Sequence, residues 1–174
     1  MKKNPKTKKA LLSLCLAATL CAAVPLSASA AAVPQEVSQS ATSVRTISTT
    51  VEYLPDGSSL TTEVQEVVGP QTRATVTKTG QKVLTYKDSN GKLLWKYTLT
   101  AEFSVNQGVS ATCTRANGLP TVYASDWSTA GNQPSRSGNR ATGTVTMQRK
   151  VLGNVVETKR ETITLTCDKN GNLS

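Results

Sequence analysis

Very few residues of this sequence combine the type and spacing that catalysis needs. The chain contains no histidine, which excludes Ser-His-Asp triads, Cys-His pairs and the usual histidine-containing zinc sites. A carboxylate pair of the glycoside hydrolase kind needs no histidine, and Asp126 beside Trp127 is the nearest candidate for one half of it. An aspartate in a polar segment more often bonds to its own backbone in a turn. We therefore predict no catalytic residues.

Cofactor sites are not indicated either. The sequence contains no phosphate-binding loop, no dinucleotide-binding glycine pattern and no calcium-binding loop, each of which has a characteristic spacing. Gly138 and Gly143 are isolated glycines of the kind found in turns and strands. We predict that the protein uses no cofactor and no metal ion.

A polar segment at residues 125–139 is the first candidate for a binding surface. It contains Trp127 and Arg136, and Arg140 follows directly after it. We interpret it as a long loop, and loops of this length often carry function. Trp127 could stack on a sugar ring or on a partner's side chain. The alternative is that Trp127 anchors the core, as is usual for a tryptophan in a domain with few aromatic residues.

A group of basic residues is the second candidate. These residues flank the Gly153-Asn154 turn, and they are Arg149, Lys150, Lys159 and Arg160. If the flanking strands pair as a hairpin, the four cations gather near one end of a sheet, where an anionic wall polymer could bind. A solvated polar surface explains the same residues equally well. The predicted binding surface comprises both candidates.

The first thirty residues have the pattern of an export signal. Five lysines within residues 1–9 precede an apolar run at residues 10–24, and Ala28-Ser29-Ala30 supplies the small residues that a signal peptidase recognises. The apolar run is shorter than the roughly 20 residues that a membrane-spanning helix requires. We predict a cleaved signal peptide at residues 1–30, with the cut after Ala30, and a secreted protein without a membrane span.

Removal of the signal peptide changes the charge of the chain. The peptide holds five of the 20 lysines and arginines and none of the 11 acidic residues, so the mature chain carries +4 instead of +9. The remaining positive charge lies in the second half of the chain and could favour an anionic partner. No nucleic-acid-binding motif accompanies it. We therefore expect no nucleic acid among the partners.

Only two cysteines follow the signal peptide, Cys113 and Cys167. In the oxidising exterior two such cysteines are expected to pair. A disulfide that closes a loop of about 55 residues stabilises a fold by roughly 4 kcal/mol on the chain-entropy model. A redox-active or nucleophilic cysteine is not indicated, because the sequence has neither a CxxC pair nor a histidine to activate it.

These candidate residues lie on segments with the alternation of β-strands. Residues 31–43 are rich in Ala, Ser and Gln, and we predict a flexible leader there. From Val44 onward, period-two alternation dominates. The clearest case is residues 93–105, in which every odd position is apolar from Leu93 to Val105. A strand of this length would span roughly 40 Å, so we expect a bulge or bend within it.

The same alternation recurs at residues 109–114, 141–148 and 162–167, with threonines on the outer faces. Turn signals such as Pro55-Asp56-Gly57 and Asp88-Ser89-Asn90-Gly91 separate the strands. We predict an all-β fold of about eight or nine antiparallel strands. Residues 44–174 would form one β-sandwich domain with one disulfide, Cys113 to Cys167.

The order of Cys113, Trp127 and Cys167 resembles the Cys-Trp-Cys pattern of immunoglobulin domains, in which a disulfide joins two sheets against a tryptophan. The resemblance is partial. Leu165 stands where the tyrosine of an immunoglobulin corner would lie, and few residues follow Cys167 to form a last strand. Immunoglobulin-like topology is therefore one alternative within the sandwich class.

Several short motifs are spread over the second half of the chain. They are Asp88-Ser89-Asn90-Gly91 before Trp95, Asn106-Gln107-Gly108 before Ser110-Ala111-Thr112-Cys113-Thr114, Ser137-Gly138-Asn139, Leu165-Thr166-Cys167-Asp168 and the final Gly171-Asn172-Leu173-Ser174. With them, residues 86–174 resemble a set of uncharacterised small secreted proteins of Gram-positive, often gut-dwelling, bacteria. The resemblance covers about half of the chain. It implies secretion and sheet structure, and it implies no activity.

Three functional classes are compatible with these observations. The first is a secreted, non-enzymatic β-sandwich that binds a glycan, an anionic wall polymer or another protein at the bacterial cell surface or exterior. The second is a secreted effector or inhibitor with antimicrobial or protease-inhibiting action. The third is a small carboxylate-dependent glycan hydrolase. An exposed Trp127 with polar neighbours would favour the first class, a protruding ordered loop the second, and carboxylates converging in a deep cleft the third.

Overall fold

The computed structural model describes residues 42–69 and 76–174, which belong to one compact unit. The predicted signal peptide, its cleavage after Ala30 and the leader up to residue 41 lie outside the described residues. The first strand begins at Ser43, one residue before the expected start of the domain. Within the described ranges we find no helix long and apolar enough to cross a membrane.

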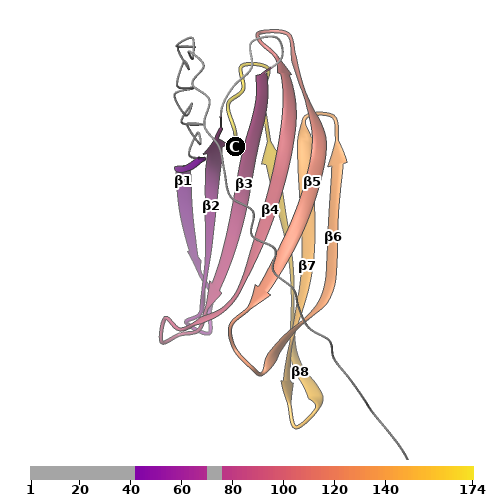
Figure 1. Ribbon diagram of the computed structural model, residues 1–174. Coiled ribbons are helices and arrows are strands. Elements are labelled where there is room, and N and C mark those ends of the chain that lie inside the picture. Colours follow the sequence, from indigo (N-terminus) through magenta and orange to yellow (C-terminus); the bar gives the residue numbers. More distant parts are fainter. Residues whose placement is uncertain (1–41, 70–75) are drawn as a thin grey trace, which may run out of the picture. The chain divides into compact units, whose positions relative to one another are not determined.

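The described residues form eight antiparallel strands in two sheets (Figure 1). The strands are β1 (Ser43–Tyr53), β2 (Ser59–Val68), β3 (Val76–Lys87), β4 (Leu93–Asn106), β5 (Ser110–Val122), β6 (Trp127–Ser137), β7 (Arg140–Val151) and β8 (Asn154–Thr166). Strands β1 to β5 make a five-stranded sheet and β6 to β8 a three-stranded sheet, each in sequential order. The prediction of an all-β, antiparallel fold is confirmed.

The strand order differs from that of an immunoglobulin domain. There the chain crosses between the two sheets several times. Here the eight described strands change sheet only once, between β5 and β6. The Cys-Trp-Cys spacing is therefore not accompanied by an immunoglobulin-like strand order.

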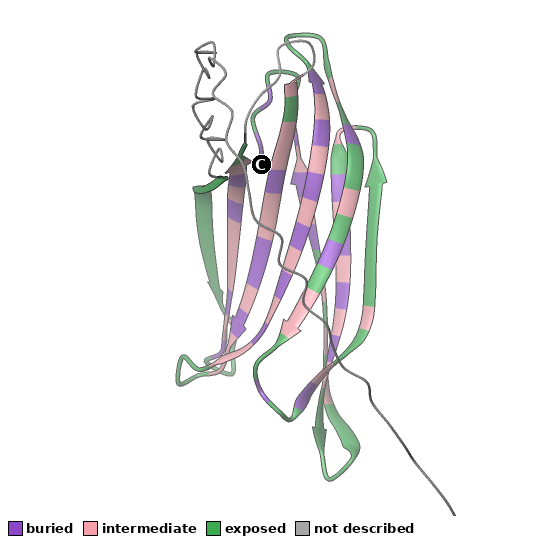
Figure 2. Cartoon of the chain, in the orientation of Figure 1, coloured by how far each residue is buried: buried purple, intermediate pink, exposed green. Residues whose placement is uncertain are grey.

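Strand β4 follows the predicted alternation along its whole length, and Figure 2 shows buried bands along it. Its buried residues are Trp95, Tyr97, Leu99, Ala101, Phe103 and Val105, each at most 2% exposed. The register against β3 shifts between Tyr86 and Lys87, which leaves Leu94 as the extra residue of β4, so the expected irregularity lies near the start of the strand. The register against β5 also shifts, between Glu102 and Phe103, but there the extra residue is Thr114 of β5. Burial continues with the same parity beyond it, so the shift leaves the inward face of β4 unchanged.

The buried faces of the two sheets contribute to one hydrophobic core. The three-stranded sheet supplies Ala141, Val145, Met147, Ile163 and Leu165. The sheets approach closely at Gly143, where a Cβ atom would lie 2.9 Å from Tyr97 Cε1 and 3.1 Å from Leu99 Cδ1. Glycine is thus required at this position because the Tyr97 ring occupies the space of a side chain.

The interpretation of residues 125–139 as a long loop is wrong. Trp127–Ser137 forms β6, which pairs with β7 along its length. Strand β6 is an edge strand with most side chains exposed, so it has no apolar-polar alternation to identify it. Pro134 is compatible with this position, because an edge strand tolerates a residue without a backbone donor. Trp127 is only 5% exposed and belongs to the core.

The predicted disulfide between Cys113 and Cys167 is absent from the structure, in which both are buried free thiols. The Sγ atoms point to different carbonyl oxygens, that of Cys113 to Arg115 O at 3.3 Å and that of Cys167 to Asp168 O at 3.5 Å. Burial raises the pKa of both thiols, that of Cys167 to about 11. Their backbones lie near one another, because their N–H groups donate to adjacent carbonyls at Gly138 and Asn139.

Candidate functional site

A polar pocket of about 280 Å³ lies at the end of the fold where the β1–β2, β3–β4 and β5–β6 connections meet. These connections share one end because neighbouring strands alternate in direction. The pocket is lined by four acidic and two basic residues, which are Asp56, Asp88, Asp126, Glu157, Lys92 and Arg149. Residues Tyr86 and Trp127 also line it. We refer to this site as the loop-end pocket.

The β1–β2 connection forms one wall of the loop-end pocket. The Asp56 carboxylate accepts hydrogen bonds from the Ser58 backbone N–H, at 3.0 Å, and from the Ser58 hydroxyl. The bonds from Ser58 lower the pKa of Asp56. Ser58 is itself only 3% exposed, and its Oγ lies 3.2 Å from the hydroxyl of Tyr86. These contacts fix the position of the Asp56 carboxylate before any ligand binds.

The β3–β4 turn forms the adjacent wall. Asp88 Oδ1 accepts the backbone N–H groups of Asn90 and Lys92, at 3.0 and 2.9 Å. Gly91 closes the turn with φ of 80°, a left-handed conformation that glycine adopts readily. The turn predicted from Asp88 to Gly91 is confirmed. It places Asp88 and Lys92 together at the mouth of the pocket.

The third wall comes from the β5–β6 connection and the β7–β8 hairpin. Arg149 lies between two carboxylates, with Nε 3.0 Å from Asp126 Oδ2 and Nη1 3.7 Å from Glu157 Oε2. Lys159 approaches Glu157 at 3.4 Å and lies 5.5 Å from the centre of the Tyr86 ring. Ion pairs as exposed as these add little stability. Their effect is to hold the charged groups in fixed relative positions.

Three aromatic rings support the pocket from below. The Tyr86 ring centre lies 5.1 Å from that of Trp95 and 5.7 Å from that of Trp127. Trp95 is completely buried, and its indole N–H has no hydrogen-bond acceptor in the part of the chain that the structure describes. Because these rings are packed in the core, they give the pocket a rigid floor.

The residues of the predicted binding surface do not lie together in the structure. Trp127 and Arg149 line the loop-end pocket, and Lys159 lies beside it. Lys150 is exposed next to it, and its backbone N–H donates to Asp126 O at 2.7 Å. Arg160 pairs in register with Thr146 on the outer face of the three-stranded sheet.

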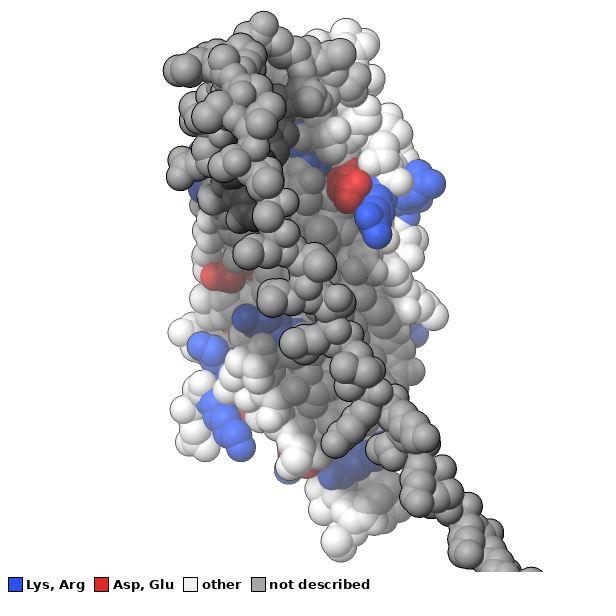
Figure 3. Space-filling view, viewed as in Figure 1, with Lys and Arg blue, Asp and Glu red and all other residues white. Residues whose placement is uncertain are grey.

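The two remaining residues lie at the opposite end of the fold, beside the β6–β7 turn. Arg136 donates to the Cys113 carbonyl at 3.1 Å, and Arg140 is exposed. The predicted cations therefore do not form one basic surface. On the face seen in Figure 3, the visible basic side chains also lie in several separate places.

Sequence analysis did not identify Asp56, Asp88, Lys92 and Glu157 as site residues. Asp56 and Asp88 were recognised only as turn residues. The sequential hairpin pattern could have predicted that Asp56 and Asp88 lie close together, because alternate turns of a meander lie at the same end of the sheet. Glu157 and Arg149 face each other in register across β7 and β8, which the hairpin around Gly153 also implied.

Comparisons with protein-family models, with curated proteins and with solved structures find no match to this chain. Within residues 42–69 and 76–174, no group of three or more Cys, Asp or Glu residues has the arrangement of a metal site.

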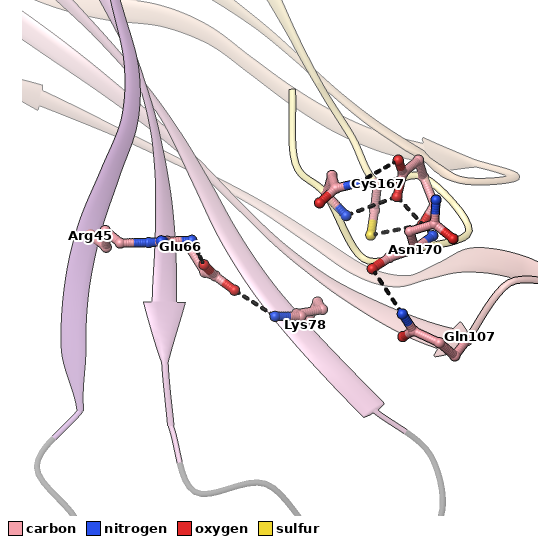
Figure 4. A network of polar contacts seen from close by, with 8 residues as sticks. Arg45, Glu66, Lys78, Gln107, Cys167 and Asn170 are labelled. Carbon is pink, nitrogen blue, oxygen red and sulfur yellow. Dashed lines mark hydrogen bonds and ion pairs between the residues drawn. The ribbon is translucent and has the colours of Figure 1, made fainter.

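A second polar cluster lies at the opposite end of the fold (Figure 4). Glu66 is 8% exposed and faces inward on β2. Its carboxylate accepts hydrogen bonds from Lys78 Nζ at 2.6 Å and from Arg45 Nη2 at 2.7 Å. The hydrogen bond from Lys78 is the main cause that lowers the pKa of Glu66. All three residues come from neighbouring strands, so the cluster ties β1 and β3 to β2.

We expect Glu66→Gln to lower the free energy of unfolding by about 1–3 kcal/mol at pH 7, because it weakens two charge-assisted hydrogen bonds at a buried site. The ordinary pKa of glutamate is 4.5, and the folded protein holds it lower. The contribution of Glu66 is thus complete above pH 4.5 and disappears as the pH falls through the folded pKa. Urea unfolding of both proteins at pH 7 and at low pH measures this.

The control is Glu63→Gln on the same strand, since Glu63 forms no ion pair among the described residues. It should change stability little at either pH. An equal cost of Glu66→Gln at both pH values would contradict the assigned role of the ion pairs.

Proposed function

We propose that the chain is an exported, non-enzymatic β-sandwich protein that binds a short neutral glycan in the loop-end pocket. The proposal does not rest on an exposed Trp127, because Trp127 is buried in the core. The observation that carries it is the mixture of hydrogen-bond acceptors and donors that line one pocket. Sugar hydroxyls both donate and accept hydrogen bonds. Carboxylates such as Asp56 and Asp88 would accept from them, while Lys92 and Arg149 would donate to them.

An anionic wall polymer fits this pocket less well. Arg149 and Lys159, two of the four cations considered for such a polymer, are already engaged by Asp126 and Glu157. The pocket also contains more acidic than basic side chains. Electrostatic attraction of a polyanion would therefore be weak at this end of the molecule.

A glycan hydrolase is also less well supported than a binding protein. Retaining and inverting glycosidases need one carboxyl group that donates a proton to the leaving oxygen. Asp126, the candidate from the sequence, contacts Arg149, and so does Glu157. This arrangement suits positioning of a ligand rather than proton transfer.

Lys92→Met tests the binding site with little risk to the fold, because no contact of the Lys92 ammonium group is seen among the described residues. The probe is an array of neutral and acidic oligosaccharides, followed by titration calorimetry with the strongest binder. We expect a neutral oligosaccharide to bind, and Lys92→Met to weaken binding by about tenfold, as loss of a charge-assisted hydrogen bond does.

The control for Lys92 is Lys96→Met, on the outer face of β4 and outside the pocket. It should leave glycan affinity unchanged. Absence of binding to every neutral oligosaccharide, or equal effects of the two variants, would overturn the proposal.

Export would also change the state of the two cysteines. We propose that Cys113 and Cys167 form a disulfide in the oxidising exterior, where their thiols lose two protons and two electrons to an external disulfide that becomes two thiols. Their nearness at the β6–β7 turn supports this. Mass spectrometry of exported protein, alkylated without reductant after unfolding, should find no modified cysteine. Two alkylated cysteines would refute the bond.

The β7–β8 hairpin favours a second candidate function, that of a secreted inhibitor or effector. Its tip exposes four apolar residues, Val151, Leu152, Val155 and Val156, and Leu152 is 97% exposed. Leu152 also has φ of 50° and is the only non-glycine residue with positive φ in the described ranges. Strain and exposure at one residue are typical of a contact site. The tip could enter an apolar cleft of a target enzyme.

Leu152→Asn should raise the free energy of unfolding by about 1 kcal/mol. Leu152 and Gly153 both have positive φ, which a type I′ turn requires, and Asn-Gly is the preferred pair there. Thermal melts compare it with Leu152→Ala, which removes the apolar side chain without providing a residue suited to this backbone. If the two variants are equally stable, the turn is not strained. The proposed inhibitory role is tested separately with a panel of proteases. If the tip enters a protease cleft, the wild-type protein should inhibit a protease and the Leu152→Asn variant should not.

A further inference from the structure

Strand β1 is the free edge of the five-stranded sheet. Within the described ranges it pairs only with β2, and Figure 2 shows it exposed along its length. Its large apolar side chains are between 42% and 78% exposed, and these are Val44, Ile47, Val51 and Tyr53. An edge strand with unpaired backbone groups can accept a further strand.

The two faces of β1 follow from its register with β2. The register shifts between Thr46 and Ser48, which leaves Ile47 as the extra residue of a bulge. Arg45 and Glu52 lie opposite inward-facing residues of β2, so both lie on the inner face. Val44 and Tyr53 lie opposite outward-facing residues and share the outer face. Apart from Ile47, successive residues from Val44 to Tyr53 lie alternately on the outer and the inner face.

This pattern is complementary to itself. Consider β1 laid antiparallel to a second β1 with a two-fold axis through Thr49, with the bulge residue Ile47 of each copy left out of the register. Arg45 then lies opposite Glu52, and Val44 lies opposite Tyr53. Each pairing occurs twice because of the symmetry. Opposite charges directly across a strand pair attract, and so do aromatic and β-branched side chains. The positions of Arg45, Thr49 and Glu52 thus match a symmetric pair.

We propose that β1 is a dimerisation edge, at which two copies of this chain pair through antiparallel β1 strands to form one continuous sheet. This inference does not depend on the proposed function. Charges and bulges on an edge strand usually prevent such pairing. Here the two charges are opposite in sign, and symmetric pairing brings Arg45 of each copy beside Glu52 of the other copy.

The surroundings of the two charges support the pairing. Arg45 contacts Glu66 at 2.7 Å but keeps 71% of its side chain exposed, so it can bridge to a second carboxylate. Glu52 is exposed and contacts no cation among the described residues. Burial, followed by the charge of Glu52, raises the pKa of Glu161, which indicates that Glu52 lies near a like charge. Arg45 of a second copy would offset this repulsion.

Cross-linking tests the register directly. Cα atoms of opposed antiparallel residues lie about 4.5–5.5 Å apart, within the range of a disulfide. In Thr49→Cys, two opposed thiols would lose two protons and two electrons to oxidised glutathione, which becomes two reduced molecules. We expect a covalent dimer. Thr46→Cys is the control on the same strand and face, because Thr46 lies opposite Val51 rather than itself and should not cross-link.

Charge exchange tests the pairing without a covalent bond. Glu52→Arg keeps the Arg45 to Glu66 ion pair, so the monomer should fold, but it places like charges opposite each other twice. Sedimentation velocity should show dimer affinity lowered by about tenfold or more. A wild-type monomer at every concentration, or equal cross-linking of the Thr49 and Thr46 variants, would overturn the proposal.

Discussion

Phe103→Ala should lower the free energy of unfolding by about 3–5 kcal/mol, the usual cost of removing a large buried aromatic side chain. Phe103 is completely buried on the inward face of β4, among the core residues shared by the two sheets. The loss combines the hydrophobic transfer energy of the ring with the cavity left behind, which neighbours on two separate sheets can fill only partly. Urea unfolding at pH 7 measures it.

Thr100→Ala is the matched control on the same strand. Thr100 faces outward on β4, so the change should cost less than about 1 kcal/mol. Similar losses for the two variants would contradict the assignment of Phe103 to the inner face and Thr100 to the outer face of β4.

Gly143→Val should cost about 3 kcal/mol, at the upper end of what overpacking a core usually costs. Its Cβ would meet Tyr97 Cε1 at 2.9 Å and Leu99 Cδ1 at 3.1 Å, and both belong to the opposite sheet. The two sheets would have to separate, or the Tyr97 ring would have to leave its position. Tyr97 also bonds Asn132 Oδ1 through its hydroxyl, at 3.1 Å, which limits its movement.

Gly131→Val provides the comparison. A Cβ at Gly131 meets only Thr146, at 3.4 Å or more, so valine fits there and suits an edge strand. Thermal unfolding of both variants shows whether the loss of stability comes from the lack of space at Gly143 or from replacing any strand glycine. If Gly131→Val is as destabilising as Gly143→Val, the close approach of the sheets is not the cause.

Prediction from sequence was most successful where buried and exposed positions alternate regularly along a strand. Residues 93–105 alternate between a core face and an outer face, and the pattern of hydrophobicity reports this directly. The turn at Asp88 to Gly91 was predictable for a similar reason, since its side-chain and glycine preferences are local.

Features that depend on long-range arrangement were not predictable. Strand β6 is an edge strand, so its residues show no alternation, and only its pairing with β7 makes it a strand. The loop-end pocket joins Asp56, Asp88 and Glu157, which are far apart in the chain. Asp56 and Asp88 belong to turns at one end of the same sheet, but their meeting with Glu157 depends on how the two sheets pack, and no local pattern encodes that.

The single crossing between the sheets has a consequence for the kinetics of folding. Within each sheet, the described strands pair with their neighbours along the chain, so most pairings close short loops, and the entropy lost in each closure is small. All-β proteins with interleaved sheets must first join distant segments and fold slowly for that reason. This chain can instead assemble hairpin by hairpin. Only the docking of β6–β8 onto β1–β5 remains as a late, cooperative step that excludes water from the core.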